Sequence, residues 1–134
     1  MIGVVDTSAL IRLFVPDGPL PDNFSEFMRG VERGINRAIA PELLVAEAAN
    51  VINKKRTSKE LTGSESVHLL SDLLAVPIRL FPHRPILSRA FDMAHENNLT
   101  VYDALYFALA EEHGAVIFSA DDQLVSVAVR LGFA

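Results

Sequence analysis

The chain has 134 residues, of which half are hydrophobic, and its 12 basic and 17 acidic side chains give a formal net charge of −5. Such a chain is long enough for one domain with a substantial core and too apolar to be disordered. The absence of cysteine excludes disulfide bonds, a zinc site with thiolate ligands and a cysteine nucleophile. No apolar stretch is long enough to cross a bilayer, and the first residues lack the basic region of a signal peptide. We therefore expect a single domain over residues 1–134, located in the cytoplasm.

Short apolar segments alternate with amphipathic segments along the chain. The apolar segments predict four strands, at residues 2–5, 37–40, 78–81 and 115–118. The amphipathic segments predict helices near residues 8–15, 23–34, 41–56, 59–75, 85–97, 101–113 and 121–131. Pro41 is expected to open its helix, Leu74 to face the core, and Gly114 to follow the last residue of another helix. Alternating strands and helices predict an α/β fold in which helices cover both faces of a parallel sheet.

Acidic residues follow the first and the last predicted strand. Asp6 comes directly after residues 2–5, and in open parallel sheets ligands bind beyond the carboxyl ends of the strands. Asp121 and Asp122 follow residues 115–118 in the same way. Aspartate also caps helices, so Asp6 and one of the later pair have a purely structural alternative. We favour Asp121 for a site because it is nearer the strand end, and we expect Asp122 to face solvent.

Two more acids lie among apolar residues in predicted helices. Glu47 shares a helical stripe with leucines three and four positions before it. Burying its charge costs roughly several kcal/mol unless the carboxylate is paired or bound to a metal. Arg37 is a candidate partner, and a place at the surface is the other alternative. Asp103 lies in an almost entirely apolar run, at a spacing from Thr100 that also fits the cap of a helix.

The four acids are most informative together. Asp6 and Asp121 would lie at one edge of the sheet, and helices carrying Glu47 and Asp103 can approach that edge. Carboxylates gathered without Lys or Arg repel one another unless a cation lies between them. Oxygen ligands without His or Cys point to Mg²⁺ or Mn²⁺. The four histidines, at positions 68, 83, 95 and 113, show no metal-ligand spacing and are expected at the surface or at caps.

Four short motifs, which together span nearly the whole chain, contain these acids. They read VVDTSAL (4–10), PELLVAEAAN (41–50), VYDALYFALA (101–110) and IFSAD (117–121). In this order they resemble the motifs of the PIN-domain nucleases, and especially of the VapC-type toxins of prokaryotic toxin–antitoxin pairs. The resemblance implies a three-layer sandwich, in which helices flank a short parallel central sheet of four to five strands. Members of this family commonly end in a fifth short strand, which we expect here to be absent or minimal.

The resemblance also implies an activity and a set of site residues. The activity is Mg²⁺- or Mn²⁺-dependent hydrolysis of RNA phosphodiester bonds, which leaves a 5′-phosphate and a 3′-hydroxyl. The implied catalytic and metal-binding quartet is Asp6, Glu47, Asp103 and Asp121, and the implied supporting residues are Ser119, Thr7 and Ser8. The implied partners are RNA, a VapB-type antitoxin and a second copy of the chain in a homodimer.

Other interpretations remain open at this level. Lys54, Lys55 and Arg56 form a short basic run that is a candidate RNA-binding surface, and Arg29 with Arg33 is another. For both groups a solvated helix surface is the simpler interpretation. The main alternative function is a non-catalytic PIN-like module that binds RNA or a protein. A phosphotransfer enzyme with an aspartyl nucleophile is less favoured, because such enzymes often carry a second Asp two residues later, where this chain has a serine.

Overall fold

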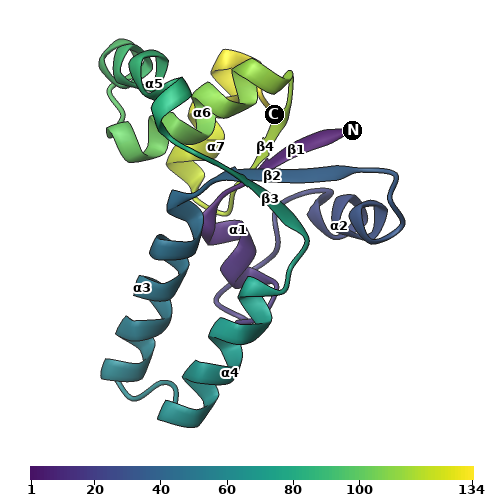
Figure 1. Ribbon diagram of the computed structural model, residues 1–134, viewed down its shortest axis with the longest axis vertical. Helices are drawn as coiled ribbons and strands as arrows, with labels where there is room; N and C mark the ends of the chain where they lie inside the picture. Colours follow the sequence, from purple (N-terminus) through teal and green to yellow (C-terminus); the bar gives the residue numbers. More distant parts are fainter.

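The structure is a computed structural model that describes residues 1–134, and a parallel four-stranded sheet runs through its centre (Figure 1). The strands are β1 (Ile2–Val5), β2 (Arg37–Pro41), β3 (Ile78–Phe81) and β4 (Val116–Phe118), in the order β3-β2-β1-β4. In the middle of the sheet, Val4 of β1 pairs with Ile39 on one side and Ile117 on the other. Such a strand is enclosed on both faces, which explains why β1 is apolar throughout.

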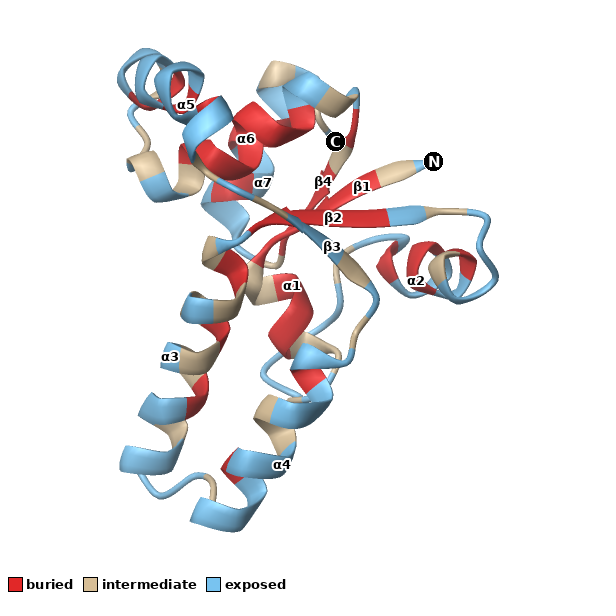
Figure 2. Ribbon diagram, in the orientation of Figure 1, coloured by how far each residue is buried: buried red, intermediate tan, exposed pale blue.

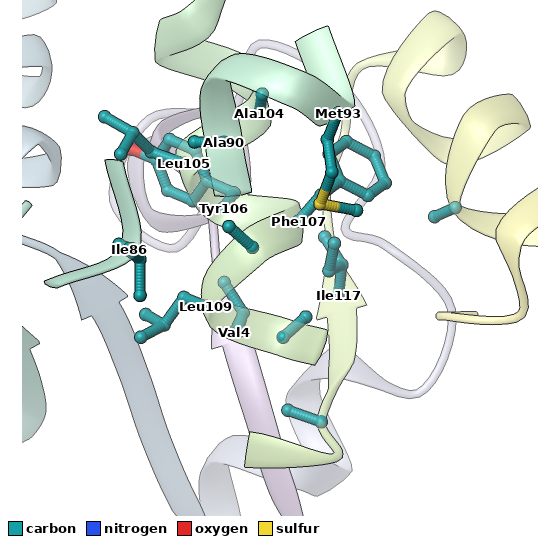
Figure 3. Packing of buried hydrophobic residues seen from close by; sticks show 14 of the residues in the cluster. Val4, Ile86, Ala90, Met93, Ala104, Leu105, Tyr106, Phe107, Leu109 and Ile117 are labelled. Carbon is teal, nitrogen blue, oxygen red and sulfur yellow. The ribbon is translucent and has the colours of Figure 1, made fainter. Parts of the chain in front are cut away.

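Seven helices surround the sheet. They are α1 (Thr7–Arg12), α2 (Phe24–Glu32), α3 (Leu43–Thr57), α4 (Gly63–Leu74), α5 (Arg84–Asn97), α6 (Val101–His113) and α7 (Asp122–Leu131). One core lies between the sheet and α5, α6 and α7, where Tyr106 and Phe107 of α6 are completely enclosed (Figure 3). The other core lies between the opposite face and α1 to α4. The α/β fold and the three-layer arrangement predicted from the sequence are therefore confirmed.

Helices α3 and α4 form a hairpin that projects from the sheet (Figure 1). Their sides that face each other and α1 carry the buried residues, whereas their outer sides are exposed (Figure 2). Leu74, at the end of α4, is 59% exposed, so the prediction that it faces the core is wrong. None of the seven helices is both long and apolar enough to cross a membrane.

The structure also changes two details of the predicted elements. Pro41 ends β2 instead of opening a helix, and the turn that follows it is fixed by the amide of Glu42, which donates to Phe81 O at 2.9 Å. No fifth strand forms, but the amide of Ile117 in β4 donates to Phe133 O at 2.7 Å. A single backbone hydrogen bond therefore takes the place of the minimal fifth strand.

Candidate active site

A pocket of about 430 Å³ opens at the carboxyl ends of β1 and β4. All four acids of the predicted quartet line it, as do Thr7 and Ser8. The quartet comes from four different elements: the turn after β1, the second turn of α3, the first turn of α6 and the turn after β4. The structure thus brings together side chains that lie up to 115 residues apart, from position 6 to position 121.

Asp6 is the most enclosed acid of the chain, with 4% of its surface exposed. Its Oδ1 accepts hydrogen bonds from the Ser8 hydroxyl at 2.8 Å and the Ala9 amide at 2.9 Å, which makes it the N-cap of α1. Its Oδ2 accepts from the Ser119 hydroxyl at 2.5 Å. Burial raises the pKa of Asp6, and the charge of Asp121 adds to the rise, while the hydrogen bonds from Ser119, Ala9 and Ser8 oppose it. The carboxylate of Asp6 therefore both caps α1 and lines the pocket.

Two serines join the turn after β1 to the turn after β4. The Ser8 hydroxyl accepts from the Ala120 amide at 2.9 Å and lies 3.3 Å from the Ser119 hydroxyl. Ser119 Oγ also accepts from the Asp121 amide at 3.0 Å. These contacts connect the turn that carries Asp6 to the turn that carries Asp121. The supporting role of Ser8 and Ser119 stays a prediction.

Glu47 is held by two hydroxyl groups on one oxygen. Its Oε1 accepts from Thr7 Oγ1 at 2.9 Å and from the Tyr106 hydroxyl at 2.6 Å. The proposed ion pair with Arg37 is wrong, because Arg37 is the first residue of β2 and α3 begins beyond that strand's opposite end. Burial and the hydrogen bond to Glu47 raise the pKa of Tyr106 far above its usual value, so its hydroxyl keeps its proton. Neutral donors thus solvate Glu47 without cancelling its charge.

Asp103 and Asp121 complete the acidic lining. Burial raises the pKa of Asp103, and the charges of Glu47 and Asp121 raise it further. Asp121 is the N-cap of α7 and accepts from the amide of Gln123 at 2.9 Å. Asp122 is exposed and lines a separate hollow, as its predicted solvent-facing position requires.

No basic side chain neutralises the quartet. Lys55 and Arg89 make all the salt bridges of the chain, and their partners lie outside the quartet. Arg12 is the one basic residue that lines the pocket, and its guanidinium donates to Pro19 O at 2.8 Å. Repelling carboxylates without a counter-charge suit a divalent cation with a preference for oxygen ligands. No group of three or more of these acids is arranged to hold a metal ion in this structure. The fit to Mg²⁺ or Mn²⁺ therefore rests on the chemistry of the donors, which are all oxygen atoms.

Several residues of the pocket were not identified from the sequence. Tyr106 follows Asp103 by three positions and Asn50 follows Glu47 by three, so each lies on the same helical face as an acid and lines the same pocket. That spacing is the signal that could have found them. Arg12 and Asp17 also line the pocket, and only the folded loop after α1 brings Asp17 there.

The predicted RNA-binding run lies near the end of α3, and none of its three residues lines the pocket, although Asp17, which pairs with Lys55, does. Lys55 is engaged by two acids, with its Nζ 2.9 Å from Asp17 and 3.1 Å from Glu60. Arg56 donates to Asn53 at 2.7 Å, and Lys54 is exposed. Lys54 and Arg56 therefore remain the more available cations of this run.

Comparison with known proteins places the chain in a family. The family model of the PIN domain matches residues 3–130. The chain is 31% identical over 126 residues to ribonuclease VapC3 of Pyrobaculum aerophilum, and the match covers 90% of each protein. In fold it is similar to the crystal structure of PAE2754 from the same organism, with a TM-score of 0.70, 22% identity and coverage of 98% and 96%. It is also similar to Mycobacterium tuberculosis VapC20, described as a toxin that cleaves the sarcin-ricin loop, with a TM-score of 0.67, 14% identity and the same coverage. These matches confirm the resemblance seen in the four motifs: the chain belongs to the PIN-domain family and, within it, to the VapC ribonucleases.

Proposed function

We propose that the chain is a Mg²⁺- or Mn²⁺-dependent endoribonuclease, the toxin of a toxin–antitoxin pair. The observation that carries the proposal is the pocket in which Asp6, Glu47, Asp103 and Asp121 gather without a basic partner. The raised pKa of Asp6 and of Asp103 means that burial, and then the neighbouring acids, make their ionised forms less favourable in the folded protein. Functional sites are where such unfavourable electrostatics are usually kept. Family membership supplies the reaction class, since the relative with 31% identity is a ribonuclease.

The side chains have distinct tasks in this proposal. The four carboxylates hold the divalent cation, with Asp6 and Asp103 as direct ligands and Glu47 and Asp121 beside them or acting through water. When bound, the cation activates water and stabilises the negative charge of the scissile phosphate. Ser119 and Ser8 hold Asp6 in one orientation by donating to its two oxygens. Ligands fixed in this way need little rearrangement on binding, which is how supporting residues strengthen a metal site.

The partners follow from the same family and from the remaining cations. We propose that RNA approaches along Lys54, Lys55 and Arg56, with Lys54 and Arg56 making the phosphate contacts because Lys55 is already paired. A VapB-type antitoxin would restrain the activity, and the active form would be a homodimer. With RNA as its substrate, we propose the cytoplasm as its location.

A pair of adjacent aspartates offers a matched test. Asp121→Asn removes one carboxylate of the pocket and keeps a good helix cap, whereas Asp122→Asn removes an exposed carboxylate outside it. We expect the first variant to lose Mg²⁺-dependent cleavage of RNA about 10- to 100-fold and the second to cleave as the wild type does. Products should carry 5′-phosphate and 3′-hydroxyl ends. Equal activity in both variants would refute the assignment, and RNA binding without cleavage by the wild type would support the non-catalytic module instead.

A further inference from the structure

The carboxylate of Glu47 is bound asymmetrically. Both hydroxyl donors, from Thr7 and Tyr106, reach the same oxygen, Oε1, at 2.9 Å and 2.6 Å, and the two hydroxyls lie 3.2 Å apart. The other oxygen, Oε2, accepts no hydrogen bond from the protein. An ionised carboxylate has about four acceptor positions. One side of Glu47 is therefore saturated, and the other is left for a ligand in the pocket.

Tyr106 is suited to fix this orientation. Only 2% of its surface is exposed, and its ring is enclosed in the core between α6 and the sheet (Figure 3). A ring that is packed on all sides cannot change its side-chain conformation, so the position of its hydroxyl is fixed. Tyr106 also lies one helical turn after Asp103, so the side chain that holds Glu47 belongs to the helix that carries another acid of the quartet.

The hydrogen bond between Tyr106 and Glu47 also connects the two helical layers. Glu47 comes from α3, which packs on one face of the sheet, and Tyr106 from α6, which packs on the other. Asp103 shares α6 with Tyr106, and Thr7 follows Asp6 directly. The two hydroxyls thus tie Glu47 to the elements that carry Asp103 and Asp6.

We propose that Tyr106, together with Thr7, is a positioning residue that turns Glu47 so that Oε2 is the oxygen presented to the divalent cation. This inference rests on the proposed function, because it assumes that the cation binds among the four acids. It adds a residue of the hydrophobic core to the metal site. Residues that orient metal ligands typically change metal affinity by about 10- to 100-fold when they are replaced.

The chain offers a matched pair of variants for the test. It has two tyrosines and no tryptophan, and both tyrosines lie on α6. Tyr106→Phe removes only the hydroxyl that donates to Glu47, whereas Tyr102→Phe removes a hydroxyl from a residue that is 63% exposed. Titration of the metal-free protein with Mn²⁺, followed by calorimetry, should show binding about 10- to 100-fold weaker for Tyr106→Phe and unchanged for Tyr102→Phe.

A spectroscopic measurement tests the contact directly. In Tyr102→Phe the only tyrosine is Tyr106, so the near-ultraviolet tyrosine absorption reports on this one hydroxyl. Addition of Mn²⁺ should produce a difference spectrum that saturates at the Mn²⁺ concentration measured by calorimetry. Thr7→Ser should retain Mn²⁺ affinity and Thr7→Val should lose it, which provides a second test if the tyrosine variant does not fold.

The outcomes separate the two proposals. The positioning role is overturned if Tyr106→Phe binds Mn²⁺ with wild-type affinity, or if Mn²⁺ leaves the tyrosine spectrum unchanged. In either case Mn²⁺ binding by the wild type would leave the proposed function intact. Failure of the wild type itself to bind Mn²⁺ would overturn both. Weaker binding in Tyr106→Phe and Thr7→Val, with Tyr102→Phe and Thr7→Ser unaffected, would establish the inference.

Discussion

Replacing Asp6 by asparagine should make the metal-free protein more stable while it removes the metal site. Asp6 is almost completely buried, and burial is the main cause of its raised pKa. An acid whose pKa is raised by folding destabilises the folded state at every pH where it is ionised in the unfolded chain. Asparagine removes that charge, and it can still accept the Ala9 amide as the N-cap of α1. Its amide group can be accommodated by rotation of the Ser119 hydroxyl, which now donates to Oδ2.

The size of the effect follows from the linkage between pKa and stability. Each pKa unit by which folding raises the value for an acid corresponds to about 1.4 kcal/mol. In a domain of this size, 1 kcal/mol moves Tm by about 3–5 °C. Mg²⁺ at 100 times its dissociation constant stabilises a protein that binds it by about 2.7 kcal/mol. The wild type should therefore unfold below Asp6→Asn in EDTA, and Mg²⁺ at 100 times its dissociation constant should raise the Tm of the wild type by about 8–13 °C but not that of Asp6→Asn.

Circular dichroism can follow thermal unfolding at neutral pH, first with EDTA and then with Mg²⁺. It measures the Tm of both proteins under each condition. Asp72→Asn is the control, because Asp72 is exposed and its carboxylate makes no hydrogen bond. This variant should follow the wild type under both conditions. The reasoning is refuted if Asp6→Asn is less stable than the wild type in EDTA and if Mg²⁺ raises its Tm as much as that of the wild type.

Three further variants test separate parts of the fold. Asp103→Asn should be more stable than the metal-free wild type, by a margin that grows as pH rises. The reason is that the pKa of Asp103 is higher in the folded than in the unfolded protein, so the wild type loses stability as pH rises from the unfolded pKa through the folded pKa. Urea denaturation at several pH values measures this margin, and a margin that does not change with pH would contradict the prediction. Gly3→Ala should cost about 1–3 kcal/mol in urea denaturation, because a Cβ there would lie 2.6 Å from Phe27. Gly63→Ala should not lower stability in this way, because a Cβ at Gly63 meets open space. An equal loss of stability in both variants would argue against the clash at Gly3. Thr62→Ala should lower stability by about 1 kcal/mol through loss of the capping box of α4, while Thr62→Ser preserves it; a similar loss in both would show that the cap is not the cause.

Sequence patterns correctly predicted the features of the fold that depend on residues close together in the sequence. The helix predicted at residues 101–113 has these bounds in the structure, because both of its ends are set by neighbours in the sequence. The Thr100 hydroxyl accepts the Asp103 amide at its start, and Gly114 has a φ of +59° at its end. The order of strands and helices likewise sufficed to predict a parallel sheet with helices on both faces.

The errors concern contacts between residues far apart in the sequence. The partners of Glu47 are Thr7 and Tyr106, which lie 40 and 59 residues away, and the residues around Glu47 do not indicate them in place of the Arg37 that we expected. Pro41 was expected to begin a helix because proline suits a first turn, but in the fold it pairs with Phe81 at the end of a strand. Both outcomes depend on how the sheet is assembled, which the local sequence does not specify.

The structural and functional interpretations of the acids are not exclusive. Asp6 caps α1 and Asp121 caps α7, as the structural alternatives required, and both also line the pocket. A cap holds a carboxylate at a helix start, and in this fold the helix starts lie beside the carboxyl ends of the strands. Capping patterns alone therefore cannot decide whether such an aspartate belongs to a site.

The pairing of β4 with β1 has a consequence for how this protein is made. Translation proceeds from the N-terminus, so Asp6, Glu47 and Asp103 all emerge before the three-residue strand that delivers Asp121. A growing chain that lacks β4 also lacks Ser119, the donor to the second oxygen of Asp6. The four-acid pocket is therefore complete only after β4 has paired with β1, so its assembly waits for the strand that is made last.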